Sequence, residues 1–158
     1  MKLLSTPATP WHTPDEYWQG LAEATDALDA PYGVISLEAL SHNAADMVRR
    51  ASGVPMRVAS KSIRVRAVMD AVLELDDFRG VLAYTLSEAL WLAETIDDVV
   101  VGYPSVDRAA IAALGTSPAL AERVTLMIDS VEHLDFIDSV LSPQHRETIR
   151  VCIDIDAS

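Results

Sequence analysis

The chain has 158 residues, of which half are hydrophobic and 23% are charged, and its formal net charge is −12. This length suffices for one domain of ordinary size with a buried core, and the apolar content argues against disorder. An excess of acidic residues disfavours nucleic acid and anionic membranes as partners, since both attract positive patches. We therefore expect a soluble, cytoplasmic protein, and the single cysteine, Cys152, fits a reducing compartment.

Residues 1–30 are predicted to be a lead-in with one helix. Prolines punctuate this stretch, and "PDEYWQGLAEATDAL" then has the composition of a helix with acidic residues in its first turn. The first residues, "MKLLSTPATPWHTP", lack the apolar core of a signal peptide. No apolar run approaches the ~20 residues that are needed to cross a bilayer.

From residue 31 onward, short β-prone runs alternate with helical patterns. A first run, "YGVISL", precedes a helical pattern that ends near residue 51, and further strands are predicted to begin near 57, 81, 98, 124 and 150. Single helices are predicted between these strands. In these helices Thr85 and Glu88 have the spacing of a capping box, Gly115 is expected to close one helix, and Asp129 is expected to cap another.

This βα alternation predicts a parallel sheet with right-handed crossovers. The strands are near-continuous apolar runs, as in sheets that are covered on both faces. Two architectures fit the pattern: an open doubly wound sheet, or part of a (β/α)8 barrel. In both, functional residues gather at the carboxyl ends of the strands.

Lys61 is the strongest candidate at these strand ends. It follows directly after "MRVAS" and shares one strand face with Arg57 and Ala59, the face that would line a barrel. Apolar neighbours lower the pKa of a lysine, so a larger fraction of it is the neutral amine. The neutral amine can attack an aldehyde or a ketone. The alternative is a lysine whose ammonium simply reaches solvent just beyond a strand. Among the last residues, Asp154 and Asp156 share a strand face and could belong to a site.

Other kinds of site lack a signal in the sequence. Neither of the glycine-rich phosphate-loop patterns is present, which argues against a nucleotide-binding doubly wound sheet. Ser60 and Ser62 lack a recognisable histidine partner for a hydrolytic triad. No metal site is predicted, because the histidines and the cysteine lack metal-ligand spacing and are expected to be solvated or packed: His12, His42, His133, His145 and Cys152.

With Lys61 at a strand end, the chain resembles the N-terminal half of the alanine racemase-like, fold type III pyridoxal-phosphate (PLP) family. It is most similar to the branch with D-threonine aldolase, D-serine dehydratase and amino acid deaminase/aldolase proteins. The resemblance rests on the order and spacing of several segments: "YGVISLEALSHNAADM", "RVASKSIR", "GVLAYTLSEALWLAE", "IDDVVVGYP", "VTLMIDSVEHLDFI" and "VCIDIDAS". The aldolase branch commonly has a histidine where this chain has Ala59.

The resemblance implies a PLP cofactor attached to Lys61 as a Schiff base. It places Arg57 beneath the cofactor ring, and we predict that Tyr84 and Asp156 complete the cofactor-binding residues of this chain. The implied reaction is that of a lyase, aldolase or deaminase on D-hydroxy amino acids, with a small amino acid as the substrate. Amino-acid racemisation and a non-catalytic PLP-binding barrel are the alternatives.

The resemblance also implies that residues 31–158 form only the N-terminal part of a PLP barrel. Five barrel strands are expected where a closed barrel has eight. The later strands and the C-terminal β-domain, which in the family pairs with "YGVISL", would be missing. We therefore expect a homo-oligomer or a missing C-terminal part, and an isolated chain that is inactive or inert, because an open barrel exposes a strand edge and its inner apolar face.

Overall fold

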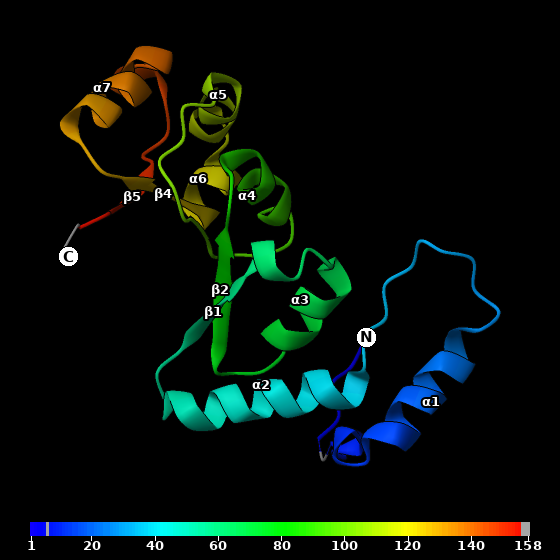
Figure 1. Cartoon of the computed structure of the whole chain (residues 1–158). Helices are drawn as coiled ribbons and strands as arrows, with labels where there is room; N and C mark the ends of the chain where they lie inside the picture. The colour runs from blue at the N-terminus through cyan, green and yellow to red at the C-terminus, as the bar shows by residue number, and fades with distance from the viewer. Residues whose placement is uncertain (6, 156–158) are drawn as a thin grey trace. The chain divides into compact units, whose positions relative to one another are not determined.

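The computed structural model describes residues 1–5 and 7–155, and it divides the chain into two compact units, Met1–Val54 and Pro55–Ser158. Figure 1 shows the course of the chain through both units. The first unit consists of a 3-10 turn, Pro10–His12, and two helices, α1 (Pro14–Thr25) and α2 (Leu37–Ala51). No helix among the described residues is long and apolar enough to span a membrane.

Two serines fix helix α2: one caps its first turn, and the other binds the backbone of the first residues. The Ser36 hydroxyl accepts a hydrogen bond from the Ala39 amide at 3.3 Å, which is the usual capping contact. The buried Ser41 hydroxyl accepts from the Leu4 amide at 2.9 Å and donates to the Leu37 carbonyl at 2.7 Å. The first residues of the chain are thereby attached to α2.

The strand expected at "YGVISL" is not formed, and this prediction is wrong. Residues 32–36 belong to no helix or strand, and Tyr32, Val34 and Ile35 are exposed. A β-prone run becomes a strand only when a second strand accepts its backbone hydrogen bonds, and none within the described residues does so.

The second unit contains a parallel five-stranded sheet and its helices. Its strands are β1 (Met56–Ala59), β2 (Phe78–Ala83), β3 (Val99–Val101), β4 (Val124–Ile128) and β5 (Arg150–Ile153). Its helices are α3 (Arg66–Leu73), α4 (Leu86–Leu92), α5 (Arg108–Thr116), α6 (Pro118–Arg123) and α7 (Val131–Val140), with 3-10 turns at Ser60–Ser62 and Pro143–His145.

The strand order decides between the two architectures. The strands pair in chain order, β1-β2-β3-β4-β5, and every pair is parallel. A doubly wound sheet reverses its order at a switch point, whereas a barrel wall always steps in the same direction. The predicted fold class, a partial (β/α)8 barrel, is therefore confirmed.

The two faces of the sheet differ, as this winding requires. Val81, Val99 and Val124 lie in register on the face that packs against the helices, and each is 0% exposed. The adjoining row on the other face contains Leu82, which is 37% exposed. We call this second face the inner face; its central row is Ala59, Leu82, Val100, Thr125 and Arg150.

A bulge in β2 lies near the amino end of the sheet. Phe78 to Val81 of β2 oppose only Met56 to Val58 of β1, and Gly80 has a φ of +76° in the extra stretch. A Cβ at Gly80 would lie 2.4 Å from the Asp98 carbonyl oxygen and 2.5 Å from the Arg57 guanidinium. The glycine thus leaves room for Arg57 to pass over β2 and pair with Asp98 at 2.7 Å.

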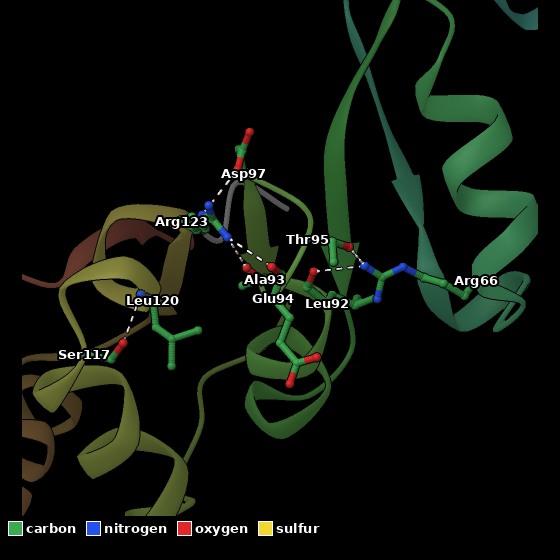
Figure 2. Close-up of polar contacts among 9 residues, drawn as sticks. All are labelled: Arg66, Leu92, Ala93, Glu94, Thr95, Asp97, Ser117, Leu120 and Arg123. Atoms are coloured by element: carbon green, nitrogen blue, oxygen red, sulfur yellow. Dashed lines mark hydrogen bonds and ion pairs between the residues drawn. The ribbon is translucent and has the colours of Figure 1, made fainter.

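Two arginines hold the carboxyl end of α4 (Figure 2). Arg123 donates to the Ala93 carbonyl at 2.8 Å and to the Glu94 carbonyl at 3.2 Å, and it pairs with Asp97 at 3.2 Å. Arg66, the first residue of α3, donates to the Leu92 carbonyl at 3.4 Å and to the Thr95 hydroxyl. The Arg123 contacts give partners to the carbonyls of Ala93 and Glu94 just beyond the helix, and both arginines place positive charge at the negative end of its dipole.

Three local predictions about the helices are corrected. Gly115 does not close α5 but lies inside it, buried, where a Cβ would come within 3.0 Å of Leu141. Helix α6, Pro118–Arg123, was not expected; it begins with Ser117, whose hydroxyl accepts from the Leu120 amide at 3.4 Å. The cap of α7 is Ser130 rather than Asp129, since its hydroxyl accepts from the His133 amide.

We expect Gly80→Ala to lower the free energy of unfolding by roughly 2–4 kcal/mol, because alanine is strained at a positive φ and its methyl group meets backbone atoms. Urea unfolding followed by circular dichroism measures this change. The control is Gly20→Ala on α1, where nothing lies within 4 Å and alanine should add about 0.5–1 kcal/mol of helix stability. Equal stability of Gly80→Ala and the natural chain would contradict the strain.

Candidate functional site

The turn after β1 places Lys61 at the carboxyl end of the sheet. Ser60 is 0% exposed, and its hydroxyl donates to the Leu82 carbonyl at 3.2 Å. Its own carbonyl accepts from the amides of Ile63 and Arg64, at 3.0 and 2.8 Å. These bonds fix a short 3-10 turn, Ser60–Ser62, and Lys61 projects from the middle of this turn.

Two tyrosines lie beside the Lys61 amine. The Lys61 Nζ is 5.6 Å from the centroid of the Tyr84 ring and 6.0 Å from that of Tyr103. The two rings meet edge to face, with centroids 5.1 Å apart and planes at 69°. Such distances allow a cation–π attraction between the ammonium and each ring and a favourable aromatic pair.

The tyrosines come from the ends of the next two strands. Tyr84 follows β2, and its amide donates to the Glu88 carboxylate at 2.9 Å, while the Thr85 hydroxyl accepts from the Glu88 amide at 3.2 Å. The predicted capping box is thus confirmed, with the Glu88 side chain reaching the residue before the cap. Tyr103 follows β3, so that three consecutive strand ends meet at one point.

A small hollow lies between these side chains. It has a volume of about 90 Å³ and is lined by Ala59, Lys61, Leu82, Ala83, Tyr84, Gly102 and Tyr103. Since sites for whole small molecules measure ≈ 300–1,000 Å³, this hollow is one wall of such a site rather than a complete pocket. Its lining is almost entirely apolar apart from the amine and the phenol groups.

The contacts of the Lys61 amine within the described residues are aromatic rather than ionic. Among the described residues, no carboxylate forms an ion pair with Lys61, although the amine is exposed and could recruit one. The nearest groups that are shown to contact it are the two rings. A primary amine is the kind of group that can attack the carbonyl carbon of an aldehyde or a ketone.

Of the other predicted site residues that the structure describes, Tyr84 lies with Lys61 and Arg57 does not. Arg57 lies on the same face but at the amino end of β1, where it pairs with Asp98, and it does not line the hollow. Its expected place beneath a cofactor ring stays a prediction. Asp156 lies outside the described residues. Its neighbour Asp154 is exposed, and its amide donates to the Ile128 carbonyl at 2.8 Å.

Tyr103 was missed as a site residue by sequence reasoning. Its position directly after Gly102, at the end of a strand adjacent to that of Tyr84, was the available signal. Among the described residues, no group of three or more His, Cys, Asp or Glu side chains could hold a metal ion.

The chemistry of this donor set fits PLP. The cofactor needs a primary amine for covalent attachment and apolar or aromatic surface for its ring, and Lys61, Tyr84 and Tyr103 supply these.

Comparison with known proteins supports the fold. The chain is similar to the crystal structure of D-threonine aldolase from Filomicrobium marinum, with a TM-score of 0.67 and 21% sequence identity. The match covers 83% of this chain and 36% of that chain, so this chain spans about a third of the aldolase's length. No protein-family model and no curated protein sequence matches the chain. At this identity the likeness establishes the fold, and it agrees with the barrel winding described above.

Asp107 connects the neighbouring helices at this end of the sheet. Its carboxylate accepts from the Ala110 amide at 3.0 Å and from the Ser87 hydroxyl at 2.8 Å. The Ala110 hydrogen bond, followed by that of Ser87, lowers the pKa of Asp107 below its ordinary value of 3.8. Because the folded-state pKa is the lower one, this carboxylate stabilises the fold above about pH 3.8, and the contribution is lost as the pH falls through the folded-state value.

We therefore expect Asp107→Asn to reduce the loss of stability between about pH 5 and about pH 3, since asparagine keeps the helix cap without the charge. Urea midpoints at the two pH values measure the effect. Ser87→Ala serves as the comparison, because it leaves the larger cause in place and should retain most of the pH dependence. Identical pH dependence in Asp107→Asn and the natural chain would rule out this role.

Proposed function

We propose that the chain carries part of the active site of a PLP-dependent lyase that acts on hydroxy amino acids. The observation that carries the proposal is the position of Lys61, at the carboxyl end of the first barrel strand and beside two tyrosine rings. The likeness to a D-threonine aldolase structure and the family resemblance of the sequence support it.

In this proposal the residues of the chain have separate roles. Lys61 would be the point of covalent attachment, and as a free amine it could carry a proton on its side of the substrate. Tyr84 and Tyr103 orient the amine and form an aromatic wall of the site. PLP, when bound, supplies an electron sink for a bond that breaks beside the substrate Cα.

The proposal concerns the site and not turnover by the isolated chain. The chain spans about a third of the aldolase structure that it resembles. A hollow of about 90 Å³ holds only part of a substrate or cofactor. We propose that the remaining walls come from parts of the barrel without a counterpart here, and that the isolated chain binds the cofactor without completing the reaction.

Reductive trapping tests the attachment point directly, because Lys2 and Lys61 are the only lysines in the sequence. After incubation with PLP and borohydride, we expect peptide mass spectrometry to find the added mass mainly on Lys61. Absorbance near ~420 nm before reduction should accompany the labelling, as lysine attack on the aldehyde predicts.

Lys2 is the internal control for non-specific labelling, and Lys61→Arg is the matched variant that keeps the charge but lacks the nucleophile. Labelling of Lys2 and Lys61 to the same extent, or of neither, would refute the attachment role. Retention of the absorbance band in Lys61→Arg would do the same.

A further inference from the structure

A buried histidine near the site has one ring nitrogen without a partner. His133 lies in the first turn of α7 and is 7% exposed. Its Nε2 is 2.8 Å from the Ser105 carbonyl oxygen, and within the described residues its buried Nδ1 has no hydrogen-bond partner. Because a carbonyl only accepts, Nε2 is the nitrogen that donates in this contact, and Nδ1 is the nitrogen without a partner.

A buried ring nitrogen without a partner costs free energy. An apolar side chain of similar size would avoid this cost, because it has no polar group to satisfy. What the histidine adds to this position is its hydrogen bond to Ser105. The bond joins α7 to the connection between β3 and α5, two elements that are far apart in the sequence.

That connection, residues 102–107, contains Tyr103, and we call it the Tyr103 segment. It has neither helix nor strand. The Gly102 amide donates to the Ala83 carbonyl at 2.8 Å at its start, and Asp107 accepts from Ser87 at its end. Between these two attachments, His133 holds Ser105, while Val106 is 75% exposed and gives little packing.

We propose that His133 is a positioning residue for the Lys61 site. By holding the Ser105 carbonyl, it fixes the Tyr103 segment and keeps the Tyr103 ring against Tyr84 and beside the Lys61 amine. The link to cofactor attachment rests on the function proposed above, whereas the restraint on the segment does not depend on it.

Two substitutions separate the hydrogen bond from the packing. His133→Leu fills much of the volume but has no donor. His133→Gln has an amide nitrogen at the same number of bonds from Cβ as Nε2, so it can donate to Ser105. The matched control is Ile137→Val, one turn further along the same helix and also buried, which trims the core without touching Ser105.

Hydrogen exchange of the full chain measures the restraint without any cofactor. We expect His133→Leu to speed exchange of the Gly102 and Asp107 amides, which donate to the Ala83 carbonyl and the Ser105 hydroxyl, by roughly three- to tenfold relative to the amides of β4, as the loss of one hydrogen bond predicts. His133→Gln should restore most of the protection. Ile137→Val should change exchange in α7 and β4 alike, without a selective effect on the segment.

Borohydride trapping with PLP, as above, measures the consequence for Lys61. We expect His133→Leu to slow labelling of Lys61 severalfold with Lys2 unchanged, and His133→Gln to recover most of the rate. Unaltered exchange and labelling in His133→Leu, or equal behaviour of the leucine and glutamine variants, would overturn the proposal.

The two measurements also separate this inference from the proposed function. If the natural chain labels neither lysine, the cofactor proposal fails, and with it the role of His133 in positioning Lys61. A selective rise in exchange would then still assign the restraint of the segment to His133. Faster exchange with unchanged Lys61 labelling would instead overturn the positioning role and leave the cofactor proposal standing.

Discussion

Pairing of five parallel strands in chain order is the constraint on which the rest of the second unit depends. Each right-handed crossover moves one strand further in the same direction, so the helices cover one face and leave the other free. The same winding brings all carboxyl ends to one rim. Lys61, Tyr84 and Tyr103 meet because they follow three successive strands, even though 42 residues separate the first from the last in the sequence.

The two ends of the sheet use their polar residues differently. At the amino end, Arg57 and Asp98 form an ion pair across β2. Both side chains are partly exposed, so the pair adds little to the free energy of unfolding, but it gives each charge a partner. At the carboxyl end, the contacts of Lys61 among the described residues are with two aromatic rings. This division agrees with the general behaviour of barrel folds, in which the carboxyl end carries chemistry and the amino end carries stability.

Much of this arrangement could be predicted from the sequence, because hydrophobic periodicity and capping are local. The five barrel strands, the capping box at Thr85 and Glu88, and the place of Lys61 after β1 follow from neighbouring residues. The short α6 was missed because its six residues are too few to show a helical period. The run at 32–36 was misjudged because strand formation depends on a partner that local composition does not reveal.

The contacts that define the site could not be predicted for the same reason. The contact of Tyr103 with Tyr84 depends on the register of β2 against β3, and the bond from His133 to Ser105 depends on how α7 lies on the preceding connection. His133 was expected to be solvated or packed. Its burial fits that expectation, but only its partner shows what the packing achieves.

The bulge at Gly80 adds one residue to β2 without changing which of the later side chains face the interior. Phe78 and Val81 both point toward the helices, although they are three positions apart, so the extra residue reverses the odd–even alternation of β2. Loss of one residue there would restore simple alternation between Phe78 and Val81 and leave every later side chain of the strand on its present face. Leu82 and Tyr84 would stay on the side of the interior, and Val81 and Ala83 against the helix layer. The extra residue therefore makes a crossing point for the Arg57 side chain at the amino end of the sheet, and the rim at the opposite end is built as it would be on a regular strand.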